Sequence, residues 1–403
     1  MGKMWSTKQE LDPLIEQYTV GDDPEVDLEF MRFEILSTRA HCEMLLKMGI
    51  LTKSELHAIE HALDELEYLL SRKEFKIEID EEDCHGALEN FLVRRVGETA
   101  FKVHIFRSRN EQVLNIVRLY CRHHLNGLSK KLHSLKEVFE KRAEECKNVA
   151  MPGYTHSQRA MPTTVGVWFG SFASLIGDDI TLVKFASKQL NRSPLGSAAG
   201  FGTTYPIERD FLATKLKYAS VQENPLSCQN GRCKETELVL FALSQVAATL
   251  SKFAADCLLF TTEEFNFFSL DDRFLTGSSI MPNKRNYDLF ELARAKCADV
   301  FSSLIEVFLL DKGLTSGYHR DFQLLKKPLV TAFKNVNETV AVIRKSVLGL
   351  QLNEARLKEA VSDERLYATQ KATELALREK IPYRHAYFKV KQSLEDSLAA
   401  KET

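Results

Sequence analysis

The feature that most restricts how this chain can fold is a long stretch without proline. No proline occurs between Pro24 and Pro152, and the 403 residues include only 10 prolines and 18 glycines. A proline inside a helix removes a hydrogen bond and clashes with the preceding turn, so long proline-free tracts favour long helices. No Asn-Gly or Asp-Gly pair lies between two alternating runs, so strand hairpins are weakly signalled. The sequence therefore predicts an all-α protein.

Hydrophobic periodicity divides these tracts into separate helices. Segment 234–260 is apolar on nearly every face in its middle, whereas a surface helix would show a polar stripe. We therefore expect it at the centre of a thick bundle, of the kind that subunits share. Segment 109–147, about 58 Å long as a helix, suits an elongated bundle. The predicted helices are 30–48, 53–72, 83–96, 109–147, 157–190, 207–217, 233–261, 287–311, 320–348, 353–379 and 383–400.

Composition excludes several classes of partner. The 54 Lys and Arg nearly balance the 56 Asp and Glu, for a net charge of −2, which argues against nucleic acid and against a polybasic membrane anchor. The longest uncharged apolar run, Val239–Ser251, is shorter than the roughly 18 residues of a membrane span. Eight cysteines are too sparse for a disulfide scaffold, and the first residues lack an apolar signal core. We expect a soluble cytoplasmic protein.

Three patterns suggest metal or nucleotide sites but lack the context that such sites need. His57–His61 matches HxxEH, yet it lies in an ordinary amphipathic helix. The pair Cys228 and Cys233 has no second close pair. The glycines of Gly196–Gly202 do not follow a predicted strand. The sequence predicts no metal and no cofactor.

Prolines and glycines gather in three irregular segments, Pro152–Pro162, Pro194–Pro206 and Gly277–Pro282, where function should be sought. The third continues to Asn286 as GSSIMPNKRN and leads into a predicted helix that contains Glu291. It offers two hydroxyls, an ammonium and an amide at a helix N-terminus, a position that favours anions. Composition alone leaves two interpretations open, an anion-binding loop and a plain N-capped polar loop.

The segment GSSIMPNKRN resembles the GSSxMPxKxN signature of the fumarase/aspartase superfamily. Three further segments resemble one branch, argininosuccinate lyase: Arg107–Gln112 (RSRNEQ), Met151–Ala160 (MPGYTHSQRA) and Tyr318–Lys326, which fits YxxDxQxxK. The resemblance extends over about residues 20–390 and suggests the short bacterial form. It implies a three-domain helical fold whose central long-helix bundle forms the core of a homotetramer. The expected domains are 1–107, 108–348 and a small, shortened 349–403.

The resemblance also implies a reaction, the elimination of fumarate from N-(L-arginino)succinate to give L-arginine, as in arginine biosynthesis and the urea cycle. Ser279 would take the proton beside a carboxylate, its alkoxide stabilised by Lys284 and backbone N–H groups. His156, oriented by Glu291, would act as general acid or activate a water. In the family these segments come from three different chains, so the active sites would be shared within the tetramer.

Substrate contacts are implied in the same way. Four residues would hold the succinyl carboxylates: Thr155, Ser278, Asn286 and Lys284. Three would help to fix the substrate: Ser37, Arg109 and Asn110. The arginine end would meet Tyr318, Gln323 and Lys326. His85 and Glu89 resemble an element that lines the family site, and they could equally be supporting polar residues.

The chain departs from the family pattern at the rim of the expected site. Ile105 and Phe106 replace a hydroxyl residue and a glycine, Tyr287 replaces a proline that helps helix entry, and Leu36 precedes Ser37 where glycine is common. These changes leave two alternatives open. One is a sibling lyase for another N-substituted succinate, and the other is a non-catalytic structural protein on the same scaffold. The segments 153–158 and 107–110 argue against adenylosuccinate lyase and fumarase.

Overall fold

The computed structural model describes the backbone of residues 11–402 and side chains to residue 396, so residues 1–10 of the predicted first domain lie outside it. The protein is 71% helical, as the all-α prediction requires. The α-helices are α1 (Pro13–Val20), α2 (Asp23–Val26), α3 (Leu28–Lys47), α4 (Lys53–Ser71), α5 (Cys84–Val96), α6 (Arg109–Glu145), α7 (Val165–Gln189), α8 (Arg209–Lys215), α9 (Pro225–Asn230), α10 (Arg232–Phe260), α11 (Asp288–Asp311), α12 (Lys326–Gly349), α13 (Glu354–Val361), α14 (Ala368–Glu379) and α15 (Tyr383–Glu402).

Short 3₁₀ helices and strands connect the α-helices. The 3₁₀ helices are η1 (Ile79–Glu81), η2 (Gly97–His104), η3 (Asp272–Phe274), η4 (Arg320–Leu325) and η5 (Glu364–Tyr367). The strands are β1 (Ala150–Thr155), β2 (Gln158–Thr164), β3 (Arg192–Ser193), β4 (Ser220–Val221), β5 (Phe268–Ser269), β6 (Thr276–Gly277), β7 (Arg285–Asn286) and β8 (Gln351–Leu352). Each strand pairs with one other: β1 with β2, β3 with β4, β5 with β8 and β6 with β7.

Three predicted helices were wrong in part, and one of them, expected over 320–348, is α-helical only from Lys326 because residues 320–325 form η4. The helix expected over 157–190 begins only at Val165, because residues 158–164 form β2 and pair antiparallel with β1. The helix expected over 353–379 is divided into α13, η5 and α14. Asp363 accounts for the division, since its carboxylate accepts a hydrogen bond from the backbone N–H of Arg365 and so caps a new helical turn.

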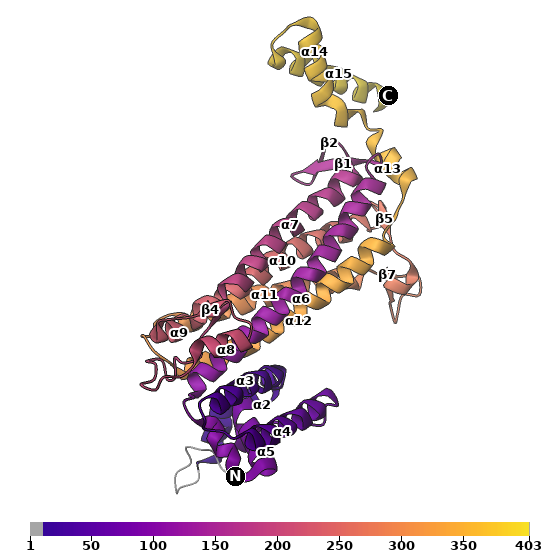
Figure 1. The fold of residues 1–403 in the computed structure, drawn as a ribbon. Helices are drawn as coiled ribbons and strands as arrows, with labels where there is room; N and C mark the ends of the chain where they lie inside the picture. Colours follow the sequence, from indigo (N-terminus) through magenta and orange to yellow (C-terminus); the bar gives the residue numbers. More distant parts are fainter. Residues whose placement is uncertain (1–10, 403) are drawn as a thin grey trace. The chain divides into compact units, whose positions relative to one another are not determined.

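The chain forms two compact units. Unit 1 comprises residues 1–130, 181–247 and 298–337, and unit 2 comprises residues 131–180, 248–297 and 338–403. The long helices α6, α7, α10, α11 and α12 contribute residues to both units (Figure 1). The predicted three-domain division stays a prediction.

Aromatic side chains fill the core of each unit. In unit 1 the ring of Tyr120 on α6 lies 4.5 Å from that of Phe30 and 5.6 Å from that of Phe333. In unit 2 Trp168 on α7 stacks on Phe253 of α10 at 5.3 Å, and its indole N–H donates to Asp256 at 2.9 Å. Such rings bury large apolar areas with specific geometry, which holds the long helices together.

Helix α10 is the segment that the sequence placed at the centre of a bundle. Among the described residues it alone is long and apolar enough to cross a membrane by length and composition, a property that buried core helices share. Its most apolar window is 61% buried within this one chain. The remaining exposed area includes Phe241 and Leu259, which leaves apolar surface on a helix without a polar stripe.

Candidate active site

His156 lies at the tip of the hairpin formed by β1 and β2. Thr155 pairs with Gln158 at the end of the ladder, so His156 and Ser157 form a two-residue loop. Both have positive φ, 53° and 60°, as in a type I′ turn, a geometry usually adopted by glycine, asparagine or aspartate. Thr155 and His156 are exposed. The hairpin therefore holds a strained backbone that projects an imidazole into solvent, a feature typical of functional loops.

The signature segment forms a second hairpin, residues 276–286, which we call the flap. Thr276 pairs with Asn286 and Gly277 with Arg285. These two antiparallel residue pairs close a loop that carries Ser278, Ser279 and Lys284. The hydroxyl of Ser278 accepts hydrogen bonds from the backbone N–H groups of residues 280 and 281 at 3.3 and 3.0 Å. Ser279 and Lys284 are exposed. A loop anchored only at its base can close over a ligand.

Glu291 lies in the first turn of α11, directly after the flap, and is exposed. Its neighbour Phe290 is buried and contacts Phe253 at 6.3 Å between ring centres. The backbone N–H of Phe290 donates to the carbonyl of Tyr287 at 2.9 Å. Helix α11 thus begins beside Tyr287 in spite of the missing proline.

The hairpin and the flap belong to unit 2, yet they lie apart there (Figure 1). Within the described residues, no hydrogen bond or ion pair joins His156 to Ser279, Lys284 or Glu291. One chain therefore does not bring the predicted acid to the predicted base.

A cavity of about 240 Å³ in unit 1 collects five of the predicted substrate contacts, which are Arg109, Asn110, Tyr318, Gln323 and Lys326. The guanidinium of Arg109 lies 3.0 Å from a carboxylate oxygen of Glu82 and 3.1 Å from one of Asp83. The amide of Gln323 donates to the carbonyls of Thr19 and Val20. The cavity is thus lined by both cations and carboxylates, a pattern that suits a zwitterion.

Lys326 is buried beside two acids that the sequence analysis missed. Its ammonium lies 2.5 Å from the carboxylate of Asp27 and 3.0 Å from that of Asp23. Burial alone would lower the pKa of Lys326, but these carboxylates outweigh it and raise the pKa above its usual value. Lys326 therefore stays charged, with most of its charge already balanced.

Arg232 at the start of α10 is a second residue of this cavity that the sequence analysis missed. Its guanidinium donates to the side-chain oxygen of Gln229 at 2.8 Å and to the carbonyl of Asn110, and lies 5.2 Å from the ring centre of Tyr318. Burial lowers its pKa to about 10. Within the described residues no carboxylate forms an ion pair with it, so it can receive an anionic group of a ligand. No sequence signal singled it out, because Lys234 and Glu235 stand beside it in the first turn of the same helix.

Ser37 lies outside the cavity. It is fully buried and accepts a hydrogen bond from the amide of Asn115 at 2.9 Å. Its predicted contact with substrate stays a prediction. The same holds for His85 and Glu89, which line a separate small cavity of about 20 Å³.

A buried charged network supports the segment that carries Arg109. The carboxylate of Glu34 lies 3.1 Å from the imidazole of His85 and 3.3 Å from the guanidinium of Arg107. Burial alone would raise the pKa of Glu34, but the charges of His85 and Arg107 outweigh it and lower the pKa to about 2. The network therefore fixes the backbone just before Arg109.

Comparison with known proteins shows the family of the chain. Residues 6–302 match the family described as lyase. The chain is 38% identical over 397 residues to the argininosuccinate lyase of Bacteroides fragilis, covering 98% of this chain and 88% of that protein. It is 36% identical over 385 residues to that of Thermotoga neapolitana, covering 96% of each. The chain belongs to the argininosuccinate lyase family.

The fold of this family member is also that of known lyases. EDDS lyase in complex with formate superposes with a TM-score of 0.81 over 98% of this chain and 78% of that one, at 22% identity. The family match and the full-length relatives confirm the sequence-based assignment and its lyase activity, and the superposition confirms the all-α fold.

Proposed function

We propose that this chain eliminates fumarate from N-(L-arginino)succinate and releases L-arginine, with no cofactor and no metal. The observation that carries the proposal is the flap, because it presents Ser278, Ser279 and Lys284 on an exposed loop that two antiparallel residue pairs close at its base. The full-length similarity to argininosuccinate lyases supports the same activity.

The proposed reaction begins at Ser279. Its alkoxide, stabilised by Lys284 and by backbone N–H groups once the flap excludes water, takes a proton from the carbon beside a succinyl carboxylate. The C–H electrons pass into that carboxylate and form an aci-carboxylate dianion, which Thr155, Ser278 and Asn286 would hold. The C–N bond then breaks as the C=C bond of fumarate forms. His156, oriented by Glu291, or a water that it activates, protonates the departing nitrogen.

The arginine end of the substrate fits the cavity of unit 1. Its α-carboxylate would meet Arg232 and Lys326, and its α-ammonium would meet the acids Asp23 and Asp83. Arg109 and Asn110 would hold the rest of the substrate's arginine end, and Tyr318 and Gln323 would lie at the rim of the cavity.

We also propose a cytoplasmic homotetramer whose active sites combine segments of different chains. Two observations support shared sites: His156 and the flap lie apart within one chain, and the long helices expose apolar side chains. On α11 these include Phe301, Ile305, Phe308 and Leu309, whose spacing places them on one helical face. Such a face is typical of a subunit interface.

The sibling lyase remains the second candidate because of Phe106. Its ring lies 5.2 Å from that of Tyr205 and replaces the glycine of the family pattern beside Arg107. This aromatic pair would narrow or reshape the entrance for the N-substituent of the succinate.

The test is fumarate release, followed by ultraviolet absorbance, from argininosuccinate and from other N-substituted succinates. We expect turnover of argininosuccinate and a loss of about a hundredfold or more in kcat for His156→Asn and for Ser279→Ala. Turnover of another succinyl amine alone would favour the sibling lyase, and no turnover of any would favour a structural protein. Variants as active as the parent would contradict the assigned roles.

A further inference from the structure

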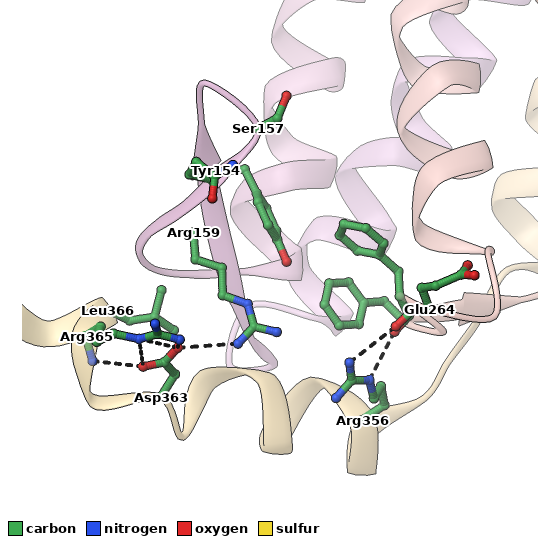
Figure 2. Close-up of a pocket in the computed structure, with 11 residues that line it drawn as sticks. Tyr154, Ser157, Arg159, Glu264, Arg356, Asp363, Arg365 and Leu366 are labelled. Atoms are coloured by element: carbon green, nitrogen blue, oxygen red, sulfur yellow. Dashed lines mark hydrogen bonds and ion pairs between the residues drawn. The ribbon is translucent and has the colours of Figure 1, made fainter. Parts of the chain in front are cut away.

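A second cavity, of about 420 Å³, lies in unit 2 between the β1–β2 hairpin and the segment 356–366. No step of the proposed reaction uses it. Its walls carry three arginines and several aromatic rings (Figure 2). Six lining residues matter here, and they are Tyr154, Arg159, Phe265, Arg356, Asp363 and Arg365.

Arg159 extends from β2 toward the cavity with most of its hydrogen-bonding capacity unused (Figure 2). Its one contact within the described residues is to Asp363, at 3.5 Å between Nη1 and a carboxylate oxygen. That same oxygen already accepts shorter hydrogen bonds from Arg365, at 2.6 and 3.1 Å. Because a guanidinium has five N–H donors, Arg159 retains several for a ligand.

The opposite wall supplies a second guanidinium in a fixed position. Arg356 donates to the carbonyls of Phe265 and Glu264 at 3.2 and 3.3 Å, and pairs with Glu359 at 2.9 Å. The carboxylate of Glu264 points away from Arg356 and Arg159 in Figure 2. The aromatic rings of Tyr154 and Phe265, whose centres are 5.6 Å apart, line the same cavity.

The cavity opens on one face of the hairpin. Tyr154 pairs with Arg159 across the ladder, so both side chains project to that face. Ser157 and Gln158, the two residues after His156, also line the cavity, so it extends to the hairpin tip that carries His156. The cavity and the expected reaction site therefore share the hairpin.

We propose that this cavity binds a small oxyanion, a carboxylate or a phosphate, between Arg159 and Arg356. Arginine suits such groups because its planar fork of N–H donors matches two oxygens at once. A bound anion would contact residues of both β2 and α13. It would therefore stabilise the hairpin conformation in which His156 and Ser157 have left-handed backbone. This effect of the anion on the hairpin rests on the proposed function, and it predicts that the anion activates the lyase.

Calorimetric titration of the full chain tests the site directly, with inorganic phosphate and malonate as separate probes. Whichever probe binds more tightly identifies the source of the oxyanion. We expect Arg159→Gln and Arg356→Gln each to weaken that binding about tenfold or more. Arg159→Lys should retain part of it, and Arg378→Gln, an exposed arginine elsewhere in unit 2, should bind like the parent. Unfolding temperatures check that each variant folds.

Two results would overturn the site. One is equal binding by the parent and both glutamine variants. The other is binding that Lys284→Gln abolishes and Arg159→Gln leaves intact, since that anion would lie at the flap. Activation is tested by kcat/KM with and without the anion, which should rise in the parent and not in Arg159→Gln. Anion binding without any fumarate release would support the cavity site and count against the proposed function.

Discussion

Nine of the described non-glycine residues have left-handed backbone, and His156 and Phe106 are two of them. His156 has φ of 53° and Phe106 has φ of 65°. Left-handed backbone costs a residue with a Cβ atom about 1–2 kcal/mol, so neighbouring structure must enforce it. At Phe106 the contact with the ring of Tyr205 helps to hold the left-handed backbone. At His156 the two-residue loop of the hairpin holds it.

This strain predicts an unusual order of stabilities at position 106. Phe106→Gly and Phe106→Ala both remove the ring contact with Tyr205, but only glycine relieves the left-handed backbone. We expect the free energy of unfolding of the glycine variant to be about 1 kcal/mol higher than that of the alanine variant. Urea denaturation of the two variants measures the difference. An alanine variant as stable as the glycine variant would contradict a strained Phe106.

Glu34 predicts a pH dependence of stability. Its pKa is lowered to about 2 in the folded chain from an ordinary 4.5. A lowered carboxyl pKa stabilises the fold above pH 4.5, and that stabilisation is lost as the pH falls toward 2. Glu34→Gln should therefore cost about 3 kcal/mol at pH 7 and progressively less below pH 4.5. Denaturation at pH 7 and pH 3 tests this, and an equal cost at both would contradict it.

Among elements, the helices were largely predictable and the strands were not. Hydrophobic periodicity and the lack of internal proline placed the long helices α6, α10 and α11 within a few residues of their observed bounds. The β1–β2 hairpin was missed because its turn is His-Ser rather than Asn-Gly, and its strands contain Pro152 and Pro162. The available signal was the two β-branched residues Thr163 and Thr164 before the helix.

The exposed face of α11 predicts an effect on assembly. Ile305 is 56% exposed at the centre of the apolar face with Phe301, Phe308 and Leu309. We expect Ile305→Asp to dissociate the proposed tetramer, because it would bury a charge without a partner at the proposed interface. Sedimentation velocity measures this. The matched control is Leu377→Asp on α14, which is 74% exposed and lies outside that face. A variant that sediments like the control would contradict an interface on α11.

At the scale of the whole molecule, the sequence predicted the family and the reaction but not the ion pairs between distant segments. The motifs are local, so GSSIMPNKRN is recognisable without any fold. The ion pairs of Lys326 with Asp23 and Asp27, and the place of Arg232, depend on contacts between distant segments, which no motif records. The separation of His156 from Ser279 within one chain agrees with the expectation, implied by the family resemblance, that these segments come from different chains.

This separation predicts that two inactive variants can restore each other. If an active site takes His156 from one chain and Ser279 from another, His156→Asn and Ser279→Ala chains that are unfolded, mixed and refolded together should form some intact sites. With random assembly about a quarter of the sites would be intact. Fumarate release by the mixture measures this, with each variant refolded alone as the control. A mixture as inactive as either variant would contradict shared sites.

The central claim is that the flap serine removes the proton that begins C–N cleavage. A crystal structure of His156→Asn with bound argininosuccinate tests it most directly. The account predicts a closed flap with the hydroxyl oxygen of Ser279 about 3–3.5 Å from the carbon that loses its proton. An occupied site in which the flap stays open and another basic group faces that carbon would contradict it.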